Sequence, residues 1–152
     1  MRHLLNHQTL QRLAQLEHLC GLLGRRVGNE GATVGREFHQ TVAGQLRQIG
    51  IRSVDAGEKR FVQALGIEVY DMRFIDENGM RHTMAQALLD TDERTHLHVS
   101  LDVDFLDPDI APGVGTTVRG GPTYREAQLC MEMIADTGLL GSLDVVELNP
   151  AL

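Results

Sequence analysis

With 152 residues, of which 42% are hydrophobic, the chain is long enough to form one globular domain with its own core. Its net charge of −7 argues against a nucleic-acid partner, because phosphate binding needs a basic patch. No stretch approaches the roughly 20 apolar residues of a membrane span, and the N-terminus does not resemble a secretory signal. We therefore expect no membrane partner. Cys20 and Cys130 have no CxxC partner and lie far apart in the sequence, which favours a reducing compartment and a cytoplasmic location.

The first 46 residues are predicted to form an N-terminal segment of helix and loop with no assigned role. Leucines spaced three and four apart predict an amphipathic helix over about 9–23. The glycine-rich stretch 24–35 predicts a loop, and a phosphate cradle is not expected there because the GxGxxG fingerprint and a preceding strand are both missing. A second helix is predicted over about 37–48.

From about residue 47 onward the pattern predicts a single domain in which strands and helices alternate. Gly66 stands where a helix would stop, and Thr123 with Glu126 forms a capping-box pattern at the start of another helix. Strands joined by helices of this length favour a three-layer α/β/α fold around a mainly parallel sheet. The predicted strands are 49–53, 68–72, 97–103 and 143–148, the predicted helices are 58–65, 81–89 and 123–137, and a loop is predicted over 107–121.

Acidic residues follow the predicted strands, where ligands of parallel sheets usually bind. Asp102 and Asp104 share parity, so an ideal strand would place both carboxylates on one face, about 7 Å apart. Burying such charges costs several kcal/mol, which a divalent metal that prefers oxygen ligands would offset. Alternatively, these aspartates cap the following turn, as the sequence Asp107-Pro108-Asp109 also suits. Glu147 lies near the end of the last strand.

Two histidines precede this pair on the same strand face. His96 and His98 share the parity of Asp102, so they are formal candidates for metal ligands. They lie earlier on the strand, however, and a hydrogen-bonded histidine is the commoner state. We expect hydrogen bonding rather than metal ligation for both.

Several longer motifs resemble those of one enzyme family. The segment 98–108 (HVSLDVDFLDP) is similar to the S-x-D-x-D-x-x-D-P signature of ureohydrolases. Further segments follow in the family's order, and their amino-acid sequences resemble those of arginase more than those of agmatinase. The resemblance covers about residues 48–152, and its other segments are 49–58 (IGIRSVDAGE), 111–116 (APGVGT), 120–126 (GGPTYRE) and 144–150 (DVVELNP).

The resemblance implies hydrolysis of L-arginine to L-ornithine and urea by a hydroxide held between two Mn²⁺ ions. It makes Asp102 a bridging metal ligand and Asp104 a second ligand. Residues implied to contact the substrate or to lie near it are Glu147 for the guanidinium group, Thr116 for the pocket that surrounds it, Asp55 for the α-amino group, and Glu58 as a nearby acid. For Asp55 and Glu58 the alternative is a turn leading into the first turn of a helix, where the helix dipole favours acids.

The family's other metal ligands, in Gly-Gly-Asp-His and Asp-Ala-His-x-Asp segments, do not occur in this sequence. Its proton-shuttling histidine is also missing, so no catalytic residue is identified. We therefore expect a truncated arginase-type hydrolase with weak Mn²⁺ binding and impaired activity in isolation. The alternatives are a non-catalytic fragment that associates with full-length subunits, and an agmatinase-type ureohydrolase. The resemblance also implies a homo-oligomer, with subunit contacts at the start of the helix near Tyr124. The alternative there is a capped, solvated helix start.

Overall fold

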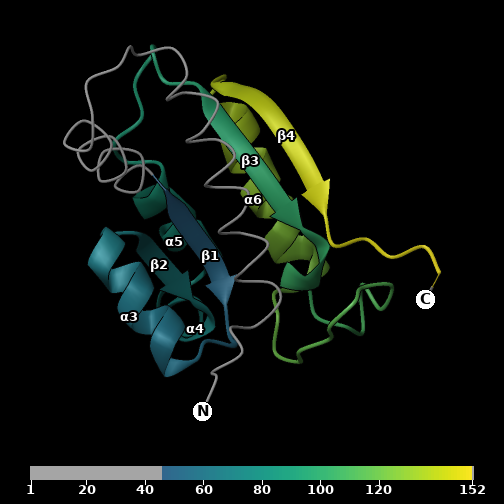
Figure 1. Ribbon diagram of the computed structural model, residues 1–152. Coiled ribbons are helices and arrows are strands. Elements are labelled where there is room, and N and C mark those ends of the chain that lie inside the picture. The colour runs from purple at the N-terminus through teal and green to yellow at the C-terminus, as the bar shows by residue number, and fades with distance from the viewer. Residues whose placement is uncertain (1–45, 152) are drawn as a thin grey trace, which may run out of the picture. The chain divides into compact units, whose positions relative to one another are not determined.

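The computed structural model describes residues 46–151, which alternate strands and helices as Figure 1 shows. Its strands pair as β1–β2 and as β3–β4, in two two-stranded sheets. The segment Val54–Glu68 belongs to one compact unit, while Arg47–Ser53 and Val69–Leu152 belong to another. The elements are β1 (Arg47–Ile51), α3 (Ala56–Leu65), β2 (Glu68–Asp71), α4 (Met72–Asn78), α5 (Met80–Ala87), β3 (Leu97–Asp102), the 3-10 helix η1 (Val103–Phe105), α6 (Tyr124–Asp136) and β4 (Leu140–Val146).

The predictions for the N-terminal segment mostly lie outside the described residues. These are the helix at 9–23, the glycine-rich loop and most of the helix at 37–48. The last two residues of the second predicted helix are in β1, so that end of the prediction was wrong. Local spacing favoured a helix there, but pairing with β2 holds the backbone in a strand.

Helix α4 was missed by the sequence analysis, which continued the second strand to Met72. The strand instead ends at Asp71, because the Asp71 carboxylate accepts a hydrogen bond from the Phe74 N–H at 2.8 Å. A side chain that satisfies a free N–H in this way starts a helix. Gly79, with φ of 81°, separates α4 from α5.

Helix α6 begins as its sequence predicts. The Thr123 side chain accepts from the Glu126 N–H, and the Glu126 carboxylate accepts from the Thr123 N–H, which completes the capping box. The helix ends at Asp136, shortly before Gly138, whose φ is 69°. Buried Cys130 lies on its inner face, and burial raises the pKa of that thiol to about 11, so it packs as a small apolar residue.

The core lies between α4, α5 and α6 and the inward residues of β1 and β3. Its buried centre joins α4, α5 and α6, and Figure 1 shows α6 behind β3 and β4. The inward residues of β1 and β3 pack onto this centre, so these two strands are held against the helices. The buried residues are Ile75, Met80, Met84, Cys130 and Ile134, with Ile49, Leu97, Val99 and Phe105 among those packed against them.

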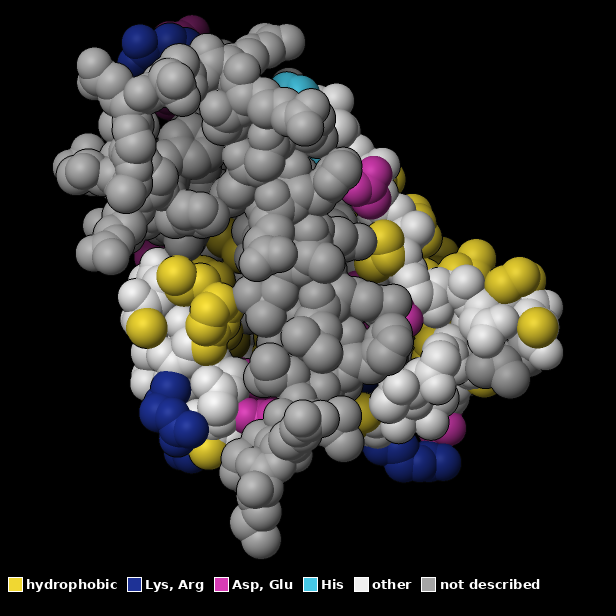
Figure 2. All heavy atoms as spheres, in the orientation of Figure 1, with side chains coloured by type: hydrophobic (Ala, Val, Ile, Leu, Met, Phe, Trp, Pro, Cys, Tyr) yellow, Lys and Arg dark blue, Asp and Glu magenta, His cyan; other side chains and the backbone are white. Residues whose placement is uncertain are grey.

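Strands β3 and β4 are parallel neighbours, with Val99 opposite Leu143 and Asp102 opposite Val146. The predicted strand 143–148 was therefore wrong at both ends, because β4 starts at Leu140 and stops at Val146. Hydrophobic side chains lie open on the surface over β4 and the segment after it (Figure 2), and Val145 is 56% exposed. Within residues 46–151 no helix combines the length and the apolar character that crossing a membrane requires.

Candidate active site

The Asp102–Asp104 pair lies at the carboxyl end of β3, but not in the geometry of a continued strand. The strand stops at Asp102, and Asp104 lies in the 3-10 helix η1. The Asp102 Oδ1 atom accepts a hydrogen bond from the Asp104 N–H at 3.0 Å. The prediction that strand alternation extends to residue 104 was wrong, because this hydrogen bond turns the chain. The turn still keeps the two half-buried residues together beyond the strand end.

Glu147 follows β4 directly, at the strand end next to that of β3. Its φ is 61°, a backbone conformation that few residues other than glycine adopt, and here it ends the strand. The next residue, Leu148, forms an antiparallel bridge with Val114, and the Asn149 N–H donates to the Gly113 carbonyl at 2.8 Å. These contacts hold the loop that contains Thr116 against the end of β4.

Glu147 and that loop also approach each other through the glutamate side chain. The Oε2 atom of Glu147 lies 4.0 Å from the position that a Cβ atom would take at Gly115. Glu147 is half-buried, whereas Thr116 is exposed. The structure therefore brings a carboxylate and the Thr116 segment to one place, next to the end of β3 that carries Asp102.

The loop over 107–121 is closed at its base by Asp107. The Asp107 carboxylate accepts hydrogen bonds from the Asp109 N–H at 3.0 Å and the Gly120 N–H at 2.8 Å. The Asp107 N–H donates to the Pro122 carbonyl at 3.2 Å. The sequence indicated the turn over residues 107–109, but the contacts with Gly120 and Pro122 come from the far end of the loop and carry no local signal.

Stability should depend on pH through Asp107. Hydrogen bonds from the Asp109 and Gly120 N–H groups hold the pKa of its carboxyl below the ordinary value of 3.8. The stabilisation is therefore complete above that value and is lost as the pH falls through the lower folded-state pKa. Asp107→Asn should lower the thermal unfolding midpoint near neutral pH, and its difference from the wild type should shrink at about pH 3. A difference that stays constant with pH would rule out this role of the carboxylate.

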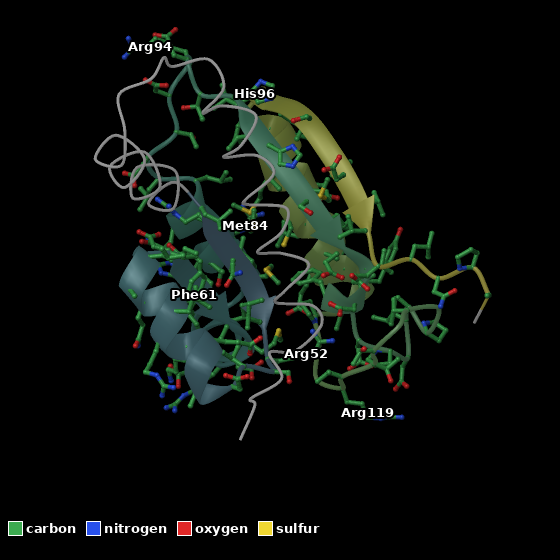
Figure 3. The ribbon with its side chains drawn as sticks, in the orientation of Figure 1. Arg52, Phe61, Met84, Arg94, His96 and Arg119 are labelled. Carbon is green, nitrogen blue, oxygen red and sulfur yellow. The ribbon has the colours of Figure 1, made fainter. Side chains whose placement is uncertain are left out.

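Arg52 is a residue of the site region that sequence reasoning did not identify. It follows β1, and Figure 3 shows it beyond the carboxyl end of that strand. Its guanidinium group donates hydrogen bonds to the carbonyls of Asp104 (2.7 Å), Phe105 (3.1 Å), Leu106 (3.2 Å) and Val118 (2.7 and 2.9 Å). An arginine within the IGIRSVD motif was visible in the sequence, but its partners are more than 50 residues away.

Asp55 and Glu58 lie at the start of helix α3, in the compact unit that contains Val54–Glu68. The Asp55 Oδ1 atom accepts from the N–H groups of Gly57 (2.6 Å) and Glu58 (2.9 Å), and the Glu58 carboxylate accepts from the Asp55 N–H (2.8 Å). Glu58 is only 7% exposed. The helix therefore starts at Ala56, two residues before the predicted start. Both acids take part in the helix start, and their substrate role stays a prediction.

Variants of Asp55 test its role as the helix cap. Asp55→Ala removes the cap and should lower the free energy of unfolding by about 1 kcal/mol. Asp55→Asn keeps an oxygen that accepts the same hydrogen bonds, so its stability should stay close to that of the wild type. Thermal melts followed by circular dichroism measure both. If the Asn variant were as unstable as the Ala variant, the charge rather than the cap would be the important feature.

His96 and His98 lie on the exposed face of β3 and contact β4. Both rings are within hydrogen-bond distance of the Ser142 hydroxyl, at 3.2 Å for His96 and 2.8 Å for His98. The Nε2 atom of His98 also lies 3.5 Å from a carboxylate oxygen of Asp144. The expectation that these histidines form hydrogen bonds is confirmed.

The described donors do not amount to a complete site for two manganese ions. Asp102 and Asp104 are adjacent carboxylates, but residues 46–151 contain no group of three or more His, Cys, Asp or Glu side chains arranged to hold a metal ion. Octahedral-type centres of Mn²⁺ need several more oxygen or nitrogen donors. No chemical step through a metal follows from these residues alone.

Comparison with known proteins gives consistent matches. The model of the Arginase family matches residues 25–152, and so starts earlier than the motif resemblance at about residue 48. The chain is 58% identical over 109 residues to an arginase of Agrobacterium fabrum, covering 70% of this chain and 33% of that protein. The chain thus spans about a third of the length of this curated relative.

Solved structures show the same likeness. The crystal structure of an arginase from Bacillus subtilis has a TM-score of 0.67 at 45% identity, covering 70% of this chain and 38% of that chain. A structure described as a hypothetical agmatinase from Burkholderia thailandensis has a TM-score of 0.59 at 30% identity, covering 77% of this chain and 36% of that chain. The arginase likeness confirms the predicted α/β fold with a mainly parallel sheet.

Proposed function

The chain belongs to the arginase family, and we propose that it supplies the guanidinium-binding part of an arginase-type site that hydrolyses L-arginine to L-ornithine and urea. It has impaired activity in isolation and binds Mn²⁺ weakly. In this proposal Asp102 and Asp104 are two of the oxygen donors for the metal pair. Glu147 and Thr116 form the guanidinium end of the site.

One observation supports this proposal above the others: the register of β3 and β4. Asp102 is paired with Val146, so Glu147 directly follows the residue opposite Asp102. Ligands of parallel sheets bind beyond the carboxyl ends of the strands. Two neighbouring strand ends thus each carry a carboxylate, and the loop with Thr116 borders one of them.

The chemistry of a guanidinium substrate suits a glutamate at this position. A guanidinium group is planar and donates parallel N–H bonds that a carboxylate accepts in pairs. The half-buried position of Glu147 limits competition from water and strengthens such a charge-assisted bond. Binding and orienting the guanidinium group is therefore the step that we assign to residues of this chain. A metal pair, when bound, supplies a hydroxide nucleophile near neutral pH.

Co-expression tests this assignment. The chain is assayed for urea release from L-arginine with Mn²⁺, alone and together with a fragment of the Agrobacterium fabrum arginase that carries the remaining ligands. We expect negligible urea from the chain alone and clear urea release from the pair. Co-purification of folded partners without urea release would contradict the hydrolase assignment and support a non-catalytic fragment that associates with full-length subunits. A rate near that of a full-length arginase from the chain alone would contradict the impaired activity.

The substrate class is tested with the same pair of fragments. Agmatine lacks the α-carboxylate of L-arginine but has the same guanidinium end. Because Glu147 and Thr116 contact only that end in our proposal, they do not distinguish the two substrates. In our proposal Asp55 receives the α-amino group, with Glu58 as a nearby acid. Faster turnover of agmatine than of L-arginine would favour the agmatinase alternative.

The proposed setting is a cytoplasmic homo-oligomer. Tyr124, at the start of α6, is 66% exposed, and the neighbouring Arg125 forms two hydrogen bonds with Glu132 at 2.8 and 2.9 Å. These exposed groups at one end of α6 support a role in contacts between subunits. Sedimentation of Tyr124→Ala beside the wild type tests this role, and an unchanged association state would contradict it.

A further inference from the structure

Four backbone carbonyls from two separate segments converge on the side chain of Arg52. Asp104, Phe105 and Leu106 supply three of them, immediately after β3. Val118 supplies the fourth, from the loop that contains Thr116. Arg52 is half-buried, and among the ion pairs of residues 46–151 none involves it. Its charge is therefore directed at carbonyl oxygens.

These carbonyls lie where regular structure ends. The η1 helix stops at Phe105, and the last carbonyls of a helix have no partner within the helix. They carry partial negative charge, which an adjacent cation stabilises. Val118 lies in a loop without strands or helices, so its carbonyl also needs a partner from elsewhere in the fold.

We propose that Arg52 is a positioning residue, which sets the segment that bears Asp104 against the loop that bears Thr116. This assignment rests on the proposed function for the roles of Asp104 and Thr116. Arg52 donates to the backbone carbonyl of Asp104. It therefore fixes the backbone position from which the Asp104 side chain extends. The bonds to Val118, two residues after Thr116, fix the loop at the other side of the site.

An arginine suits this role better than a lysine. A guanidinium group has five N–H donors fixed in one plane, so it can reach several carbonyls at once without further ordering. An ammonium group has three donors around a single atom. A lysine at this position therefore keeps the charge but can hold fewer of the four carbonyls in place.

Amide hydrogen exchange on the full 152-residue chain tests the proposal, without metal or substrate. Arg52→Met should speed exchange at residues 103–107 and 117–121 by about tenfold or more. Without Arg52 on their carbonyls, these segments should open more often and break the N–H bonds of Asp104, Asp107 and Gly120. The amides of α6 should keep the wild-type rates. Arg52→Lys should give an intermediate increase in the same two segments. Arg119→Met is the control, because Arg119 is an exposed cation of the same loop that pairs with Asp109.

The proposal is overturned if Arg52→Met leaves both segments unchanged, or if exchange rises equally throughout the chain. If Arg119→Met sped exchange in both segments equally, the proposal would also be overturned. The loss of any positive charge in this region would then explain the faster exchange. If Arg52→Met does not fold, the exchange rates of Arg52→Lys test the proposal instead. Wild-type rates in both segments of that variant would refute the positioning role.

A kinetic measurement keeps this proposal separate from the proposed function. In the co-expressed pair, Arg52→Lys should raise KM for L-arginine or lower kcat while the melting temperature of the chain changes little. A wild-type pair without activity would refute the hydrolase assignment, yet the exchange result for Arg52 would remain valid.

Discussion

Gly121→Ala should lower the free energy of unfolding by roughly 3 kcal/mol, the upper end of what overpacking costs. A Cβ atom at this position would lie 2.6 Å from the Phe105 carbonyl oxygen and 2.7 Å from the Asp107 nitrogen. Both are backbone atoms and cannot rotate away, so the loop must move. Because Asp107 closes the base of that loop, the displacement should also reach the Thr116 segment. Urea denaturation followed by circular dichroism measures the loss.

The neighbouring Gly120 provides the control. A Cβ atom there meets no atom within 4 Å, although φ is 83°. Gly120→Ala should therefore cost only the conformational strain of that backbone, about 1 kcal/mol. Equal destabilisation by the two variants would show that close packing against residues 105–107 is not the cause.

Glu147→Gln should reduce kcat/KM for L-arginine in the co-expressed pair by roughly 10- to 100-fold. The amide keeps the shape of the side chain, but it loses the charge and one of the two acceptor oxygens that a guanidinium group uses. Charge-assisted hydrogen bonds contribute about 1.5–3 kcal/mol each, and 1.4 kcal/mol corresponds to a factor of ten. Steady-state urea release measures the effect.

A matched substitution distinguishes this loss from a general effect of charge. Glu77→Gln removes a carboxylate from the exposed face of α4, where it pairs with Arg73. It should leave urea release unchanged. Glu147→Gln should also melt at the wild-type temperature, because the residue is only half-buried and its replacement is similar in shape. Wild-type kinetics for Glu147→Gln would remove Glu147 from the guanidinium site.

The features that the sequence predicted correctly are those with a local cause. The capping box of Thr123 and Glu126 starts α6, and Gly66 ends α3. The apolar alternation of β3 marks a strand whose inward residues pack on the core. The order of several motifs indicated the arginase family, which the family model and the relatives confirm. The predicted metal and substrate roles of individual residues stay predictions.

Local signals failed where a competing contact changed the backbone. Met72 was assigned to the second strand, but it is the first residue of α4, because the Asp71 side chain caps a helix there. The strand was predicted to run to Val103, with Asp104 on the face of Asp102, whereas the bond from the Asp104 N–H to Asp102 turns the chain after Asp102. Asp55 and Glu58 form the helix start that their sequence pattern allowed, and their substrate role stays a prediction.

The sequence by itself determined the family, the α/β class and the residue types at the strand ends, since these follow from motif order, periodicity and capping patterns. Only the tertiary structure decided that Asp102 pairs with Val146, which directly precedes Glu147. It also decided that Arg52 binds the segment of Asp104 and the loop of Val118. Strand register and long-range hydrogen bonds join residues more than 40 positions apart. The free energy of such contacts depends on the whole packed core, so no local pattern specifies them.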